Sequence, residues 1–213
     1  IAINASLTGH LVFSTLHTND APSAVARLTD IGIKPFLTAS AVRAIMAQRL
    51  VRKLCKECKK PGVLDEMEIR ALGLTHDQVR DATVMTPVGC SNCRQNGFRG
   101  RLAIAEIFRM DDEVRTAIND NISSVQLKRK ARELGMRNLR EDGIRKALAG
   151  MTTAAVGGMV FALMGRLPGP SGSTMAGILL FGLIARNSGL NWSPAPMSTG
   201  ITRYGRPHSS SMM

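Results

Sequence analysis

The length, composition and charge of the chain limit the classes of protein to consider. Its 213 residues, 44% of them hydrophobic, are enough for one or two domains with a real core. The formal net charge of +12, from 28 Lys and Arg against 16 Asp and Glu, suits contact with phosphates, nucleic acid or an anionic membrane surface. The one Trp, one Tyr and six Phe are not interleaved with the basic residues, which argues against stacking platforms for nucleic acid.

The two ends of the chain differ from its middle. The chain begins at Ile1 rather than at Met, so we expect an internal start within a longer protein. No charged stretch followed by an apolar run opens the chain, which gives no sign of a secretory signal. All 16 acidic residues lie at or before Asp142, whereas residues 151–213 contain four Arg, no Lys and no acid. The composition therefore changes sharply near residue 150.

Residues 1–50 are typical of an α/β segment. The apolar run Leu11–Phe13 predicts a short buried strand. The polar residues 18–20 then predict a helix N-cap, with Pro22 in the first turn and apolar residues at helical spacing up to Gly32. We expect a second helix from Pro35 to about Leu50, because Val42, Ile45 and Met46 would share one of its faces.

The middle of the chain predicts a small insert followed by a strand and helices. Residues 64–80 indicate a helical insert, and residues 101–108 alternate as expected of a strand. Three short helices are predicted at about residues 111–119, 123–134 and 138–149, with Ser124 as a cap and Gly135 as a stop.

Four cysteines form two pairs with metal-ligand spacing. Cys55 and Cys58 make one CxxC motif, Cys90 and Cys93 make another, and 31 residues separate the two motifs. Two residues between cysteines let both thiolates reach one tetrahedral Zn²⁺, and two such pairs complete a closed shell with no open position for catalysis. Nearby Lys and Arg residues favour thiolates. We therefore predict a structural zinc site; disulfides and unpaired core thiols are the alternatives.

A second candidate site lies around the predicted strand near the N-terminus. Thr15, His17 and Thr18 cluster at the end where ligands sit in open α/β sheets. A histidine there can donate a hydrogen bond to a phosphate oxygen. Thr15 and Thr18 are accordingly candidate nucleotide contacts. The alternative is a capped turn whose histidine has only a structural partner.

Several motifs in order resemble one family. Residues 5–21 resemble the histidine box of the type II secretion and type IV pilus assembly ATPases. Residues 47–52 are similar to that family's stretch leading into its metal-binding domain, and residues 89–107 to its second cysteine pair and following strand. Residues 135–153 resemble its C-terminal helical region. Together the motifs extend over residues 1–153 and are specific as a set.

The resemblance implies a fold, an activity and partners. It implies an α/β fold in which residues 1–52 are the C-terminal part of a RecA-like P-loop ATPase core and residues 53–100 are a tetracysteine zinc insert. Residues 101–153 would then be a strand with a small helical region. His17 would face the γ-phosphate of ATP and His10 would be its companion, with Cys55, Cys58, Cys90 and Cys93 as zinc ligands. The parent would use ATP and Mg²⁺ and act as a homo-hexamer on the cytoplasmic face of the inner membrane, with membrane platform proteins as partners and no nucleic acid.

The chain also departs from that family. It contains no G-x-x-x-x-G-K-[ST] loop, and the acidic segment that should hold Mg²⁺ is absent as well. Without them the transferring phosphoryl group loses its electrostatic stabilisation, so we do not expect the chain alone to hydrolyse ATP. After Thr153 the family would continue with an acidic amphipathic helix, whereas residues 154–213 are apolar and then polar and irregular. A shifted reading frame is our preferred interpretation; a membrane-associating tail and a Gly/Ala-rich linker are the alternatives.

Three functions remain open at this point. The first is a fragment of the ATPase that powers type II protein secretion, and the predicted zinc insert favours this function. The second is a fragment of a type IV pilus assembly ATPase, since relatives of that kind can carry the insert too. The third, from another class, is a zinc-stabilised module that binds nucleic acid or protein without catalysis.

Overall fold

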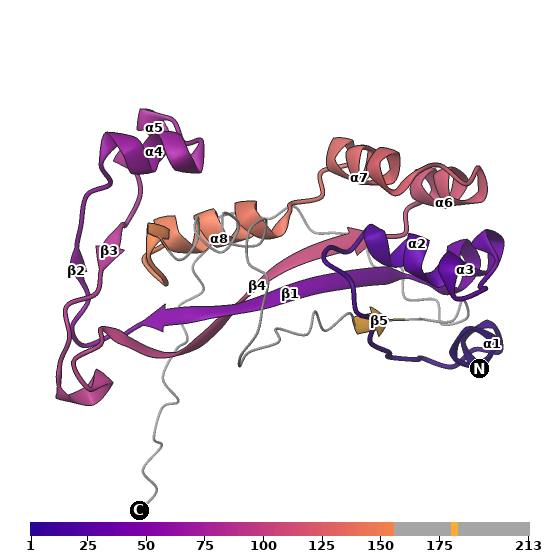
Figure 1. Ribbon diagram of the computed structural model, residues 1–213, viewed down its shortest axis with the longest axis horizontal. Coiled ribbons are helices and arrows are strands. Elements are labelled where there is room, and N and C mark those ends of the chain that lie inside the picture. The colour runs from indigo at the N-terminus through magenta and orange to yellow at the C-terminus, as the bar shows by residue number, and fades with distance from the viewer. Residues whose placement is uncertain (156–179, 183–213) are drawn as a thin grey trace, which may run out of the picture.

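A long antiparallel ribbon of two strands forms the axis of the molecule. The computed structural model describes residues 1–155 and 180–182. Strand β1 (Ala44–Leu54) pairs with β4 (Phe98–Arg109) in a register that runs from Ala44 opposite Arg109 to Arg52 opposite Arg101. The register shifts between Arg52 and Leu54. A short strand, β5 (Leu180–Gly182), adds to the other edge of β1, which gives the strand order β4-β1-β5 (Figure 1).

The second predicted helix is shorter than expected. Helix α3 (Pro35–Ala41) starts at the predicted proline but ends nine residues early, and β1 begins at Ala44. Within β1 the residues Ile45, Ala47, Arg49 and Val51 are buried on one face, which is the two-residue period of a strand. Pairing with β4, about 60 residues away in the sequence, decides this structure, and a local apolar pattern does not reveal such a partner.

The predicted strand at Leu11–Phe13 was also wrong. Helix α1 (Ala2–Leu7) precedes an irregular segment in which only Val12 makes an isolated bridge. Leu11 and Phe13 are 54% and 59% exposed, so this apolar run is not a buried strand. The predicted helix that follows is confirmed as α2 (Ser23–Asp30), but its N-cap is Pro22 rather than one of the polar residues 18–20. The Asp20 carboxylate nevertheless accepts a hydrogen bond from the Ser23 N–H at 2.9 Å.

Four helices pack at one end of the ribbon and enclose the larger core. These are α2, α3, α6 (Asp112–Asn119) and α7 (Ser124–Glu133), as Figure 1 shows. Phe108, Ile104 and Ile45 are fully buried at the centre of this core, and helix residues such as Val114 and Leu127 pack around them. The predicted helices near 111–119, 123–134 and 138–149 are confirmed within a few residues. Ser123 rather than Ser124 caps the second of them, in a capping box with Gln126.

A smaller unit occupies the other end of the ribbon. It contains β2 (Lys60–Pro61), α4 (Glu66–Leu72), α5 (His76–Arg80), β3 (Met85–Thr86) and the short helix η1 (Ser91–Cys93). The predicted helical insert is thus confirmed. Helix α8 (Leu139–Leu148) lies between the two ends, in contact with β4. Its Leu148 and Ile144, together with Ala154, pack against Leu64, Ile69 and Leu72 of the smaller unit and complete a second core.

The predicted tail, residues 154–213, lies almost wholly outside the described residues. Its proposed origin as a shifted frame, a membrane segment or a linker therefore stays a prediction. Among the helices that the structure describes, none is both long and apolar enough to cross a membrane.

Candidate metal centre

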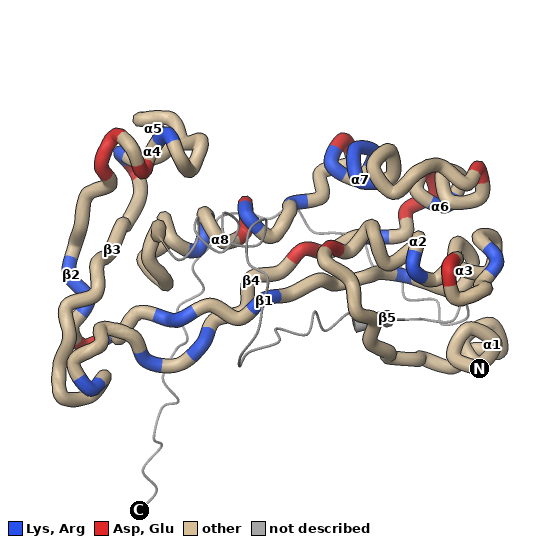
Figure 2. The backbone as a smooth tube through the Cα atoms, viewed as in Figure 1, with Lys and Arg blue, Asp and Glu red and all other residues tan. Residues whose placement is uncertain are grey.

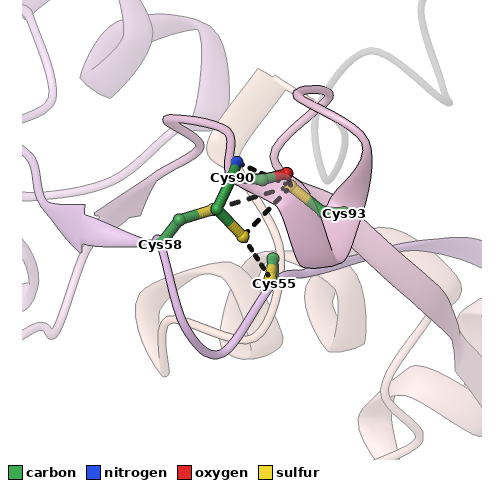
Figure 3. A group of neighbouring side chains, drawn as sticks. All are labelled: Cys55, Cys58, Cys90 and Cys93. Atoms are coloured by element: carbon green, nitrogen blue, oxygen red, sulfur yellow. Dashed lines mark hydrogen bonds between the residues drawn. The ribbon is translucent and has the colours of Figure 1, made fainter.

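The ribbon brings the two cysteine pairs together at its end. Cys55 follows directly on β1, and its N–H donates to the Gly97 carbonyl at 3.0 Å, which continues the strand pairing past Leu54. Cys90 directly precedes η1 and Cys93 is its last residue, and the next residue, Arg94, is left-handed with φ of 53°. Each CxxC motif therefore forms a tight turn that points its sulfur atoms at the other motif (Figure 3).

The sulfur geometry fits a tetrahedral metal ion. All four Sγ atoms lie within 4.8 Å of one another. The distances are 3.9 Å for Cys55 to Cys90, 3.8 Å for Cys58 to Cys93 and 3.7 Å for Cys90 to Cys93. Zinc–sulfur bonds of about 2.3 Å at tetrahedral angles place sulfur atoms about 3.8 Å apart. A disulfide would need about 2.05 Å, and all four cysteines are free in this structure, so the distances favour a metal site over disulfides.

Backbone donors support negative charge on the sulfurs. The N–H groups of Gly97 and Cys90 both donate to the Cys93 sulfur at 3.2 Å, and the Gly89 N–H donates to the Cys58 sulfur at 3.3 Å. Burial raises the pKa of the Cys93 thiol, but the hydrogen bonds from the N–H groups of Cys90 and Gly97 and from the neighbouring thiols outweigh it and lower the pKa to about 7. A backbone hydrogen bond with Cys93 lowers the pKa of the Cys90 thiol, but burial and its hydrogen bonds with the other three thiols outweigh that bond and raise the pKa to about 11, so the donors favour a thiolate at Cys93 first. Gly97 is needed here, because its φ is 75° and a Cβ atom would lie 2.4 Å from Pro87 Cβ.

The charge around the cysteines is strongly positive. Residues 49–60 and 89–101 contain nine Lys or Arg residues and a single acid, Glu57. Among the described residues, no ion pair uses any of these nine. Lys and Arg positions, blue in Figure 2, recur along the ribbon towards its metal end. Four thiolates around a divalent ion carry a net charge of −2, and this surrounding charge favours them.

Residues 150–152, which follow α8, pack against the end of the ribbon that carries the first cysteine pair. Lys59 Nζ donates to the Gly150 carbonyl at 2.9 Å, and the Leu54 N–H donates to the Met151 carbonyl at 3.0 Å. Thr152, fully buried, donates its hydroxyl to the Arg52 carbonyl at 2.8 Å. The end of α8 and the residues after it are therefore fixed directly beside the first cysteine pair.

The histidine segment forms a loop rather than the end of a strand. His10 is exposed, and its Nδ1 lies 3.1 Å from Thr8 Oγ1 and 3.2 Å from the Ala5 carbonyl. His17 is exposed as well, and no hydrogen bond or ion pair within the described part of the chain joins it to His10. Thr15 is exposed, and Thr18 donates to the Asp20 carbonyl at 3.1 Å.

Sequence reasoning missed two buried carboxylates, one on the ribbon and one on helix α8. Glu106 is 2% exposed and accepts hydrogen bonds from the backbone N–H groups of Ala21 and Leu139. Burial raises the pKa of Glu106, and the bond from Ala21 lowers it less than burial raises it. Asp142 accepts from the Ala105 N–H at 2.9 Å and pairs with Lys146. The sequence did carry one signal for Glu106: it is a charged residue at a position of the strand that faces the core, between the apolar residues Ile104 and Phe108.

The comparisons with known proteins agree with these features. A family model described as type II/IV secretion system protein matches residues 1–167. The type II secretion system protein E of Pseudomonas aeruginosa is 48% identical over 153 residues, which are 72% of this chain and 30% of that relative. The type IV pilus assembly ATPase PilB of Thermus thermophilus is 45% identical over 153 residues, 72% of this chain and 17% of the relative. The PilB of Myxococcus xanthus is 45% identical over 154 residues, 72% of this chain and 27% of the relative.

The chain spans less than a third of the length of each of these curated relatives. The family match nevertheless includes the histidine loop, the ribbon, the cysteine pairs and all of α8. This chain therefore belongs to the type II/IV secretion system protein family.

Proposed function

We propose that this chain is the C-terminal part of a cytoplasmic ATPase that powers type II protein secretion from the inner face of the inner membrane. The observation that carries the proposal is the identity of 48% over 153 residues to a type II secretion system protein E. In the proposal, residues 1–52 complete a RecA-like core whose phosphate-binding loop and magnesium ligands belong to the preceding part of the parent. The parent would assemble as a homo-hexamer against membrane platform proteins.

Within that proposal His17 contacts the γ-phosphate region, with His10, Thr15 and Thr18 as further candidates. Its support is that His17 is exposed and lies on a loop whose next residues have fixed partners. An exposed imidazole on an anchored loop can donate to a phosphate oxygen that another segment binds. Because that other segment is not part of this sequence, the chain alone should not hydrolyse ATP.

The four cysteines, in the proposal, hold one structural Zn²⁺. The S···S distances and the backbone donors support this assignment, and four thiolates would leave no open coordination position. The ion would cross-link the end of β1 to the turn before β4. We expect purified chain to contain about one zinc per molecule by elemental analysis. Cys93→Ser should abolish this content and the control Ser91→Ala, in the same turn, should keep it; a metal-free wild-type chain would contradict the assignment.

A pilus assembly ATPase is a second candidate, because relatives of that kind reach 45% identity over the same residues. The relatives do not favour the third candidate, a nucleic-acid or protein binding module without catalysis. Chimeras separate the first two. Residues 1–153 would replace their counterpart in protein E of Pseudomonas aeruginosa, and separately in PilB of Myxococcus xanthus.

Restored secretion in a strain that lacks protein E, without restored pili in the second chimera, would support the secretion assignment. The opposite pattern would support the pilus assignment. His17→Ala in the active chimera should remove its ATP hydrolysis while leaving its assembly unchanged. If neither chimera hydrolyses ATP although both fold and assemble, the proposed function is wrong.

A further inference from the structure

We propose that Glu106 is a positioning residue that ties the loop carrying His17 to the start of helix α8, and so to the metal end of the molecule. The inference deepens the proposed function and rests on it, because it gives the histidine loop a mechanical connection to the rest of the chain. It is carried by the carboxylate's two hydrogen bonds and by the contacts at both ends of α8.

One carboxylate joins two distant segments. Glu106 projects from β4 into the larger core between Ile104 and Phe108, both of which are fully buried. Its Oε1 accepts from the Ala21 N–H at 2.9 Å, and its Oε2 accepts from the Leu139 N–H at 3.3 Å. Each oxygen thus accepts from a different segment. Because Glu106 lies within β4, its backbone is fixed, and its side chain cannot move towards one donor without moving away from the other.

The two donors have no helical partners of their own. Leu139 is the first residue of α8, so its N–H is one of those that a helix leaves unpaired. Ala21 lies just before Pro22, the N-cap of α2, and is itself fully buried. A buried N–H without an acceptor is costly, so loss of the carboxylate would leave two such groups in the core.

On one side, the tie fixes the histidine loop. Asp20 pairs with Lys128 of α7 at 2.8 Å, and Arg49 Nη2 lies 3.5 Å from the Asn19 carbonyl. The Arg49 contact is long, and the Arg49 Nε has no hydrogen-bond partner although it is buried. The bond from Ala21 to Glu106 is therefore a shorter link between this loop and the ribbon than the Arg49 contact.

On the other side, α8 connects to the metal end. The Leu148 carbonyl accepts from the Thr83 N–H at 2.8 Å, and the Gly150 carbonyl accepts from Lys59 beside the first cysteine pair. Helix α8, ten residues long, therefore runs from the Glu106 bond at its start to the contacts beside the metal end (Figure 1). We therefore expect a contact between His17 and a nucleotide to shift α8 and, through it, the residues beside the first cysteine pair.

Amide hydrogen exchange of the intact chain tests the tie. Glu106→Gln keeps the shape of the side chain but offers one oxygen for two donors, and its NH₂ group faces the other donor. We expect Ala21, Leu139 or both to exchange at least about tenfold faster, while the Phe108 amide in the ribbon is unchanged. The ring resonances of His17 should shift, and those of His76 on the insert should not.

Glu141→Gln is the matched control, because it makes the same change on the first turn of α8 and still allows the capping box with Asn138. It should leave Ala21 exchange and the His17 resonances unchanged. The inference is overturned if Glu106→Gln keeps both amides within about twofold of wild type, or if Glu141→Gln reproduces the effect.

Should Glu106→Gln not fold, a pH titration of the wild-type chain decides. Asp20 and Lys128 are the charged groups that face Glu106, the first raising and the second lowering its pKa, and burial raises it most. The amide shifts of Ala21 and Leu139 should follow the Glu106 carboxyl with one midpoint above the usual range. Separate midpoints would overturn the tie. None of these measurements needs ATP. A negative result here would therefore reject the role of Glu106 without rejecting the proposed function, which the chimeras test separately.

Discussion

The pair of Asp142 with Lys146 provides a sharp test of how the ribbon is held to α8. Asp142 is 8% exposed, and its Oδ2 accepts from both the Ala105 N–H and the Lys146 ammonium group, which is 18% exposed. Asp142→Asn keeps the volume but removes the charge. Breaking a fully buried pair costs about 3–5 kcal/mol, and the exposed Arg145 adds little.

Because Lys146 keeps some contact with water, we expect a loss of about 2–4 kcal/mol at pH 7. At about 3 °C for each kcal/mol, the midpoint of thermal unfolding should fall by roughly 6–12 °C. Urea titration and calorimetry of both proteins give the two values independently. Asp77→Asn is the control: Asp77 is 89% exposed and lies 4.0 Å from Arg80, so its loss should cost under about 0.5 kcal/mol.

The pH dependence gives the sign of the effect. Burial raises the pKa of Asp142, but the bonds from Lys146 and Ala105 hold it below its usual range. The stabilisation from a carboxyl with a lowered pKa is complete above its unfolded value and disappears as pH falls through its folded value. The difference between wild type and Asp142→Asn should therefore shrink below about pH 4. A difference under about 0.5 kcal/mol at pH 7, or one that is constant from pH 3 to 7, would refute the reasoning.

Three further outcomes are expected. Phe108→Ala should lower the free energy of unfolding by about 3–5 kcal/mol in urea titration, because the ring is fully buried; a loss under about 1 kcal/mol would show that the core can collapse around the gap. Gly150→Ala should cost about 2–4 kcal/mol, since φ is 64° and the new Cβ would lie 2.7 Å from the Thr83 carbonyl oxygen; equal stability in the same titration would exclude this close approach. If the cysteines hold zinc as proposed, a chelator should open the tryptic sites at Lys56 and Arg94, whereas Arg115 on α6, whose side chain is 21% exposed, should stay protected. Equal cleavage at all three sites would contradict a metal that stabilises only one end of the ribbon.

Local signals explain which parts of the fold the sequence predicted. The helices between residues 112 and 148 have caps and apolar spacing within one or two turns, and the paired CxxC motifs carry their own spacing rule. Strand β1 was mistaken for helix because Val42, Ile45 and Met46 fit a helical face equally well. Its partner β4 is distant in the sequence, and only that pairing selects the two-residue period.

The candidate sites divide in the same way. The convergence of the cysteines was predictable because the spacing of metal ligands is local. The role of Glu106 was not, because its two donors come from segments on either side of it in the chain that meet only in the folded core. The histidine loop lies between these cases: its polar residues were visible, but its irregular structure depends on contacts with β4 and α7.

The second core has a consequence for how the metal unit can be exchanged between proteins. Leu64, Ile69 and Leu72 of the insert are covered by Ile144, Leu148 and Ala154, each of which lies more than 70 residues further along the chain than any of these three. Residues 53–100 alone are therefore not a transferable cassette, because a graft would leave one side of this core facing water. Recombination between relatives that kept the unit intact would have to move residues 139–154 with it. The cysteine pairs and the end of α8 should for this reason be inherited together.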